Sequence, residues 1–263
     1  MPFRRIDAPP VTGDAPCVVS LTSYGVRIAT AHHAIESIAK GSVRPARLVL
    51  WLAHDDLATG LPESLLRLRR RGLEIVGCDD HRSHKKYYPY VRSIVRHRLP
   101  LVTADDDTLY PSDWLERLLR AHRRAPELVH AQRARRVLLD ETGMRPYVEW
   151  PLVADRAPSP LVFPTGVGGV IYPAPLLAEL RSAGDGFMQL APSADDAWLH
   201  VHAIRAGFVA RQVNSRAPRY YSLKRAQLNA LWIRNRWAGD NDAQLRRLYG
   251  PADLALLARA RAA

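Results

Sequence analysis

The sequence has 263 residues, and its 38 Lys and Arg against 26 Asp and Glu give a formal net charge of +12. Apolar residues make up 47 % and charged residues 24 %, which excludes a disordered chain, a collagen-like fibre and a coiled-coil rod. No apolar run approaches the roughly 18 residues of a membrane span, and the basic start at residues 1–5 has no apolar stretch behind it. We therefore expect a soluble, cytoplasmic protein.

Short apolar runs alternate with amphipathic stretches over the first 105 residues, a pattern typical of a parallel βαβ sheet. The predicted strands cover residues 17–22, 47–52, 73–78 and 99–104. The predicted helices between them cover residues 30–40, 62–71 and 86–97. Their continuous apolar character suits strands that are buried on both faces.

The regular alternation ends after the fourth strand. In order, we expect a helix over 112–124, a strand pair at 127–132 and 136–139 with a turn at 140–143, a Pro-rich loop over 151–166, a strand over 167–172, a helix over 193–206, a strand over 208–213 and helical chain from about 224. No internal repeat or low-complexity tract is present in the sequence.

The basic balance predicts an anionic partner. With an isoelectric point near 10.2, the protein is expected to attract nucleotides, anionic lipid surfaces or nucleic acid, and charge alone does not choose among them. Arg-rich stretches such as residues 67–71 are equally typical of solvated helix faces. The two cysteines, Cys17 and Cys78, lie in short apolar runs, so we expect buried, inert thiols and no disulfide framework.

Three consecutive acids, Asp105, Asp106 and Asp107, follow the fourth predicted strand directly. Ligands of open α/β sheets bind outside the carboxyl ends of the strands, and this is where the triplet falls. On extended backbone Asp105 and Asp107 share a face, and two such carboxylates favour a hard divalent cation that would bridge a diphosphate. The alternative is a solvated turn, or a cap for the helix that begins near Ser112.

A second acid pair, Asp195-Asp196, stands at the start of a predicted helix. Ser193 and Asp196 have the spacing of a capping box, and Asp196 and His200 that of a surface ion pair. The functional alternative is that a carboxylate at this helix N-terminus accepts a hydroxyl proton as a general base. Trp198 beside it would then offer a flat surface on which a sugar ring stacks.

Other segments give weaker signals. The run Gly166-Val167-Gly168-Gly169 lacks the first-strand context of a dinucleotide fingerprint, so we expect a tight turn or a close backbone approach to a ligand. The basic segment 82–88 either meets phosphate or opens a solvated helix. The histidines and cysteines show no zinc-binding spacing, and no Ser stands in the nucleophile elbow of an α/β-hydrolase.

Six motifs occur in a characteristic order along residues 16–250. They are Ser20-Leu21-Thr22-Ser23-Tyr24 with Arg27, Ser83-His84-Lys85-Lys86-Tyr87-Tyr88-Pro89, Thr103-Ala104-Asp105-Asp106-Asp107 with Tyr110-Pro111 and Trp114, Gly166 to Tyr172, Ala194-Asp195-Asp196-Ala197-Trp198, and Asn241-Asp242-Ala243-Gln244-Leu245. With these motifs the chain resembles the GT-A glycosyltransferases, and in particular the family 2-like enzymes of bacterial polysaccharide and lipopolysaccharide synthesis.

The resemblance implies an α/β fold of the GT-A, Rossmann-like type, with a mixed, mostly parallel sheet flanked by helices in a single domain over residues 1–263. It divides the chain into a nucleotide-sugar-binding half (about 16–110), an acceptor-side half (about 111–223) and a C-terminal helical segment (about 224–263). It also implies a nucleotide-diphosphate sugar donor, a divalent metal such as Mn²⁺ or Mg²⁺, and inversion at the anomeric carbon.

The acid triplet matches the DXD motif of these enzymes. There the last acid, here Asp107, binds the metal, while Asp105 lies near the ribose or the waters of the metal. The residues that the resemblance assigns to the donor are Thr22, Tyr24, Arg27, Lys86, Asp105 and Asp106. A third metal ligand stays open between His200, His202 and none.

On the acceptor side, Asp195-Asp196 stands where many relatives carry Glu-Asp, whose second acid is the proposed base. Asp196 is therefore the predicted base, and Asp195 remains the alternative because Asp is a departure from the commoner Glu. The predicted acceptor-side contacts are Trp198, Gly168 and Gly169.

The sequence thus predicts a glycosyltransferase that moves a sugar to a hydroxyl of a saccharide or lipid-linked acceptor, in cell-surface glycan or glycolipid synthesis. The net charge adds the hypothesis of peripheral contact with the anionic inner face of the membrane. The alternatives are a nucleotidyltransferase that acts on a sugar phosphate, and a non-enzymatic basic module that binds nucleic acid or anionic lipid. A nucleic-acid groove would not keep three adjacent carboxylates at its centre, so no nucleic-acid partner is expected. The donor sugar, the linkage and the oligomeric state stay open.

Overall fold

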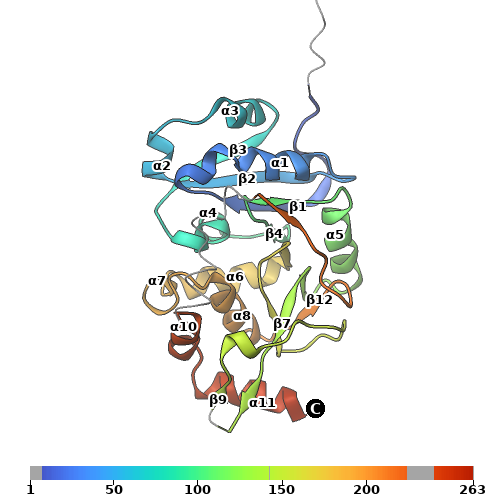
Figure 1. Ribbon diagram of the computed structural model, residues 1–263, viewed down its shortest axis with the longest axis vertical. Helices are drawn as coiled ribbons and strands as arrows, with labels where there is room; N and C mark the ends of the chain where they lie inside the picture. The colour runs from blue at the N-terminus through green and yellow to red at the C-terminus, as the bar shows by residue number, and fades with distance from the viewer. Residues whose placement is uncertain (1–7, 142, 224–239, 263) are drawn as a thin grey trace, which may run out of the picture.

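A seven-stranded mixed sheet in the order β12-β6-β11-β4-β1-β2-β3 forms the centre of the protein (Figure 1). The computed structural model describes residues 8–141, 143–223 and 240–262. The strands of this sheet are β1 (Ala15–Thr22), β2 (Pro45–Ala53), β3 (Leu73–Cys78), β4 (Leu101–Thr103), β6 (Val129–Ala131), β11 (Val170–Tyr172) and β12 (Ala210–Gln212). β11 lies antiparallel to both β4 and β6, while the other pairings are parallel. The carboxyl ends of β1 to β4 therefore meet at one edge of the sheet.

Helices cover both faces of the sheet, because its buried strands present apolar side chains to each side in turn. One face carries α1 (Ala31–Ala39), α3 (Glu63–Arg70) and α5 (Trp114–Arg124), and the other carries α4 (Tyr88–Ser93), α6 (Ala174–Ala183) and α8 (Asp195–Arg205) (Figure 1). In β1, Val19 and Leu21 pack into the first layer, whereas Val18 packs into the second. This arrangement confirms the predicted GT-A-like, mixed and mostly parallel α/β fold.

Shorter elements complete the structure around this sheet. They are the 3-10 helices η1 (Gly25–Ala29), η2 (Arg82–Lys86) and η3 (Tyr147–Glu149), the helices α2 (His54–Ala58), α7 (Phe187–Leu190), α10 (Asp240–Leu248) and α11 (Pro251–Ala262), and the strand pairs β10 (Val162–Pro164) with β7 (Ala134–Arg136), β13 (Tyr221–Ser222) with β5 (Thr108–Leu109), and β8 (Leu139–Asp140) with β9 (Gly143–Met144). The helical chain predicted over 224–239 lies outside the described residues, whereas α10 and α11 agree with that prediction further along.

Three predicted elements differ in the structure. The strands expected to pair over 127–139 belong to different sheets, because β6 pairs with β11 and β12 while β7 pairs with β10. The helix expected over 86–97 is replaced by η2 followed by the short helix α4. The loop expected over 151–166 contains β10, and α6 was not predicted.

Two expectations from composition can be compared with the structure. Both cysteines are buried, and burial raises the pKa of Cys17 to about 12 and that of Cys78 to about 11, so both thiols stay protonated at neutral pH. In the part of the chain that the structure describes, no helix is long and apolar enough to cross a membrane.

Candidate active site

The carboxylate of Asp106 ties two loops together at the carboxyl edge of the sheet. Asp106 is 5 % exposed. It accepts a hydrogen bond from the Ser23 hydroxyl (2.5 Å) and another from Nε of Arg27 (3.2 Å). The loop after β1 is thereby fixed to the loop after β4. Asp106 was predicted to bind the donor, and in the structure its side chain has this internal role.

Asp107 shares the guanidinium of Arg27, whose Nη2 lies 3.0 Å from its Oδ2. Burial raises the pKa of Asp107, and the charge of Arg27 opposes this shift. The backbone oxygen of Asp107 accepts hydrogen bonds from the Leu223 N–H (2.8 Å) and the Ser222 hydroxyl (3.3 Å). Chain from beyond β12 therefore returns to the acid triplet.

Lys86 joins the two acid motifs, which are far apart in the sequence. Its Nζ lies 3.1 Å from Oδ2 of Asp195 and 3.6 Å from Oδ1 of Asp105. Burial disfavours the charge of Lys86, but the carboxylates of Asp195, Asp105 and Asp196 hold its pKa well above the ordinary value. Burial also raises the pKa of Asp105 to about 6, although Lys86 opposes that shift. Lys86, which the resemblance assigned to the donor site, thus lies between Asp105 of the triplet and Asp195 of the acid pair.

The two structural alternatives for Asp196 do not hold. The N-cap of α8 is Ala194, and no side chain caps the helix, so Ser193 and Asp196 form no capping box. His200 is also engaged elsewhere, because its Nδ1 lies 2.6 Å from the Tyr249 hydroxyl and its Nε2 lies 2.9 Å from the backbone oxygen of Pro160. Among the described residues no hydrogen bond or ion pair to the Asp196 carboxylate is found.

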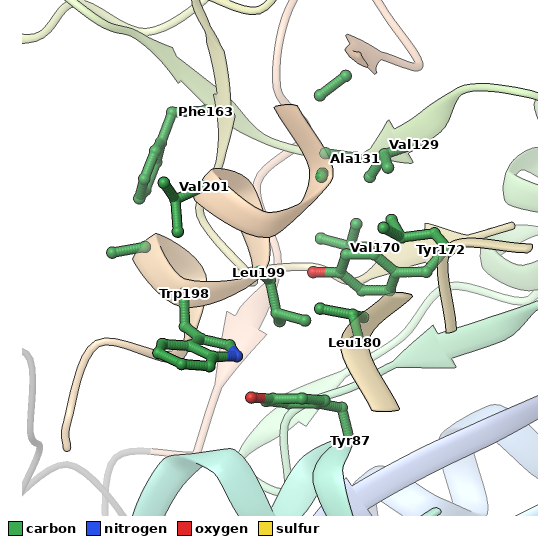
Figure 2. Close-up of a cluster of buried hydrophobic side chains, with 14 of the residues drawn as sticks. Tyr87, Val129, Ala131, Phe163, Val170, Tyr172, Leu180, Trp198, Leu199 and Val201 are labelled. Atoms are coloured by element: carbon green, nitrogen blue, oxygen red, sulfur yellow. The ribbon is translucent and has the colours of Figure 1, made fainter. Parts of the chain in front are cut away.

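The surroundings of Asp196 favour its protonated form. Burial and the neighbouring charge of Asp195 raise its pKa well above the ordinary value, and Lys86 opposes them. Asp196 is also one of the residues that line a cavity of about 10 Å³, which is room for about one water molecule. The walls of this cavity include Val129 and Leu199. Figure 2 shows both side chains in a cluster of buried hydrophobic residues, with Leu199 on α8.

Glycines in the loop before β11 make room for side chains of the protein itself. Gly166 has a φ of +65°, and a Cβ there would lie 2.8 Å from Oδ1 of Asp196. A Cβ on Gly168 would overlap the ring of Tyr220, and one on Gly169 would lie 2.7 Å from the ring of Trp114. Gly168 and Gly169 were expected to let a ligand approach the backbone, but aromatic side chains of the protein occupy that space. Gly166 is the glycine that faces the acid pair.

Trp198 does not offer the exposed ring face that was predicted. It is 3 % exposed, and its ring packs against Phe187 (5.5 Å between centroids) and His202 (4.2 Å). Figure 2 shows Trp198 on α8 among the labelled side chains of the buried cluster. A sugar stacks on an open aromatic face, so Trp198 serves as a core residue here. The sequence pattern Asp-Asp-Ala-Trp did not show that other parts of the protein, such as Phe187, cover the side of the helix on which Trp198 lies.

The remaining donor-side residues lie in the loop after β1. The hydroxyl of Thr22 donates to the backbone oxygen of Trp51 (2.9 Å), which links the ends of β1 and β2. Tyr24 is partly exposed, and the guanidinium of Arg27 lies over its ring at 5.3 Å from the centroid. Thr22, Tyr24 and Arg27 thus border the carboxyl edge of the sheet, next to the acid triplet.

The acids fit a metal only in part. Over residues 8–141, 143–223 and 240–262, no three His, Cys, Asp or Glu side chains are gathered as a metal-binding group. Both ring nitrogens of His200 are used within the fold, and the ring of His202 packs against Trp198. Asp105 and Asp107 of the triplet remain the candidate carboxylate ligands. Mg²⁺ is commonly held by one or two carboxylates together with waters and substrate phosphates. The donor set therefore suits an ion whose coordination a bound diphosphate completes.

Sequence reasoning missed several residues that position this site. Ser23 orients Asp106, and Gln244 of α10 is hydrogen-bonded to Ser193 just before α8. The backbone N–H of Tyr147 donates to Asp242 of the same helix (2.8 Å). Asp242 and Gln244 stood in a motif that contributed to the resemblance, but nothing in that motif alone showed which loops they would reach.

Comparisons with known proteins support the fold. No protein-family model matches the sequence, and no curated protein matches it. Among solved structures, the mannosyltransferase PcManGT from Pyrobaculum calidifontis, in complex with GDP-Man and Mn²⁺, aligns with 97 % of this chain and 71 % of its own at a TM-score of 0.57 and 15 % identity.

Two further solved structures have a TM-score of 0.50. TarS of S. aureus aligns with 78 % of this chain at 13 % identity, and this chain spans 60 % of that one. The 4-diphosphocytidyl-2C-methyl-D-erythritol synthase of Anaerococcus prevotii aligns with 76 % of this chain and 88 % of its own at 9 % identity. At such identities the likeness shows the fold alone, a GT-A-like α/β fold, and the reaction has to be argued from the site itself.

Proposed function

We propose that this protein is a glycosyltransferase that moves a sugar from a nucleotide-diphosphate sugar to an acceptor hydroxyl with inversion. The observation that carries the proposal is the bridge made by Lys86 between Asp105 of the triplet and Asp195 of the acid pair. It brings acids suited to a diphosphate and its metal next to Asp196, a carboxyl group without a structural partner among the described residues. The GT-A-like fold supports this reading.

In the proposed reaction Asp196 accepts the proton of the acceptor hydroxyl while the hydroxyl oxygen attacks the anomeric carbon. The bond between that carbon and the diphosphate breaks, and the nucleoside diphosphate leaves with the bonding electrons. A divalent metal on Asp107 and Asp105 would supply positive charge to the departing diphosphate. Burial and the charge of Asp195 raise the pKa of Asp196, and a raised pKa makes its ionised carboxylate a stronger proton acceptor.

Calorimetric titration with UDP, GDP and dTDP, each with and without Mn²⁺, tests the donor half of this proposal. We expect metal-dependent binding of one nucleotide and its loss in Asp107→Ala. Equal, metal-independent binding of all three would mean that the basic charge alone attracts them, and would contradict the proposal. Release of pyrophosphate from CTP or UTP in the presence of a sugar phosphate would instead favour a nucleotidyltransferase.

The acceptor is proposed to be a saccharide or a lipid-linked sugar. The net charge of +12 supports a peripheral contact with anionic lipid, which would bring the site close to a lipid-linked acceptor. This membrane contact is a separate proposal, because the reaction does not depend on it.

A further inference from the structure

Helix α8, which carries the acid pair, is tied along its length to the C-terminal helices. At its start, Ser193 is bonded to Gln244 of α10. In its middle, His200 is bonded to Tyr249, and at its end the guanidinium of Arg205 holds the carboxylate of Asp253 through two hydrogen bonds of 2.9 and 2.8 Å. Figure 1 shows α10 and α11 packed beyond α8, on the side away from the sheet.

The contact of Gln244 lies next to the acids. Gln244 is 1 % exposed. Its Oε1 accepts from the Ser193 N–H (3.0 Å), and its Nε2 donates to the Ser193 hydroxyl (2.8 Å). Ser193 precedes the N-cap Ala194, and no side chain of the cap itself fixes the first turn. The two bonds from Gln244 are therefore a specific restraint on the backbone that leads into Asp195.

Asp242, one half-turn earlier on α10, restrains a second wall of the site. It accepts the backbone N–H of Tyr147, and burial together with the charge of Asp196 raises the pKa of Tyr147 to about 12. Burial is the larger cause of that shift, and the charge of Asp196 is the next. Asp242 and Gln244 of α10 thus contact both η3 and the segment that leads into α8.

We propose that Gln244 is a positioning residue for the acid pair, which acts through Ser193 on the first turn of α8 and does not itself touch a substrate. The inference rests on the proposed function, because positioning has a consequence for rate only if Asp196 is the base. A displacement of about 1 Å in a catalytic group can lower a rate by about 100-fold. On this proposal, the Asn241-Asp242-Ala243-Gln244-Leu245 motif holds the segment that leads into α8.

The test compares Gln244→Met with Gln244→Glu. Methionine keeps the side-chain volume but loses both hydrogen bonds to Ser193, and the 3.3 Å bond from Nε2 to the backbone oxygen of Asp240 as well. Glutamate also loses the bond to Asp240, but its carboxylate can accept from both the N–H and the hydroxyl of Ser193. Arg246→Ala, at an exposed position on the same helix, is the matched control.

The probes are UDP-glucose, GDP-mannose and dTDP-glucose with Mn²⁺. Water, which is always present, serves as the acceptor of the sugar, and the rate at which the nucleoside diphosphate is released gives kcat and KM. Amide hydrogen exchange over residues 193–199 gives a readout that needs no turnover.

We expect Gln244→Met to lower kcat by about 10- to 100-fold while KM for the nucleotide sugar changes less than about twofold. Amide exchange in the first turn of α8 should become faster, Gln244→Glu should recover most of both effects, and Arg246→Ala should behave as wild type. If Gln244→Met does not fold, Ser193→Ala, which removes one of the two bonds, replaces it with a smaller expected loss.

Three results would overturn the inference. The first is that kcat and amide exchange are both unchanged in Gln244→Met. The second is a loss of kcat that Gln244→Glu does not recover, and the third is a loss of nucleotide binding in Gln244→Met as large as its loss of kcat, which would indicate general disruption of the fold. A wild-type protein that hydrolyses none of the three probes would count against the proposed function instead. In that case faster exchange at 193–199 in Gln244→Met still supports the restraint on α8, and unchanged exchange rejects it.

Discussion

Asp105 is a carboxyl group that the fold keeps at a cost in stability. Burial raises its pKa to about 6 from an ordinary value of 3.8. Below pH 4 the group is protonated in both the folded and the unfolded chain, so it makes no difference to stability. Between about pH 4 and pH 6 the unfolded chain ionises while the folded one still holds the proton, so the folded state loses stability over this range. Above pH 6 both forms are ionised and the loss stays constant.

We therefore expect Asp105→Asn to raise the free energy of unfolding at pH 7.5 by up to about 3 kcal/mol, from a shift of about two pKa units at 1.36 kcal/mol each, and to leave it nearly unchanged at pH 4. Urea unfolding at the two pH values measures this. Asp106→Asn is the contrasting variant, because it loses bonds to Arg27 and Ser23 and should destabilise the protein. A destabilised Asp105→Asn at pH 7.5 would contradict the argument.

Asp196 is expected to control the acid limb of the rate profile. The base must be ionised, and its pKa is raised, so activity should fall on acidification at a pH well above the ordinary aspartate range. Asp196→Asn should lower turnover by about 100- to 10,000-fold while nucleoside diphosphate binding is kept. The exposed Asp185 provides the control Asp185→Asn. Full activity in Asp196→Asn would assign the base elsewhere, with Asp195 the next candidate.

At the scale of elements, the loop before β11 shows how backbone conformation and site geometry are connected. Gly166 and Gly184 have nearly the same positive φ, +65° and +67°, but a Cβ at Gly184 meets nothing within 4 Å, whereas one at Gly166 meets Asp196 at 2.8 Å. The two positions therefore share a positive φ and differ in the clash with the acid.

Alanine at both positions should separate the two effects. Gly184→Ala should lower the free energy of unfolding by about 1 kcal/mol, the usual cost of a non-glycine residue at positive φ, and leave turnover unchanged. Gly166→Ala should cost more stability and should also lower turnover, because Asp196 must move. Chemical unfolding and nucleotide-sugar hydrolysis measure the pair. Equal turnover in the two variants would show that the Asp196 position tolerates the added methyl group.

The first half of the fold could be predicted closely because its strands are buried and continuous in sequence. The residues expected for β3 are those observed, and β1 and β2 extend only slightly beyond the predicted ranges. Past β4 the strands shorten to three residues, and their partners are distant in the chain, as in the pairing of β12 with β6. A local pattern carries no information about such pairing, so the strand pair over 127–139 was wrong.

The site shows the same division between local and distant information. The acid triplet could be selected from the sequence because it directly follows a buried strand, at the ligand edge of the sheet. The acid pair stood out at the start of a predicted helix, and Lys86 was selected through the family resemblance. Burial of Trp198 depends on Phe187 and His202, and the role of Gln244 depends on a contact across 51 residues. Both depend on tertiary packing that residue spacing does not encode.

At the scale of the whole molecule, the charge of +12 makes a prediction about lipid. The protein should sediment with vesicles that contain phosphatidylserine at low ionic strength. It should be released at about 0.5 M salt, where the screening length is only a few ångströms, and phosphatidylcholine vesicles are the control. Binding that is equal for both lipids, or that survives high salt, would rule out an electrostatic contact.

The ties between α8 and the last two helices also set the order in which the site can be assembled. The acid triplet and the sheet strands up to β12 all precede residue 213, but Gln244, Tyr249 and Asp253 hold α8 from positions further along. During synthesis from the N-terminus, the sheet edge can therefore form while the acid pair still lacks its restraints. The acid pair would therefore gain its restraints only after residues 244–253 have left the ribosome.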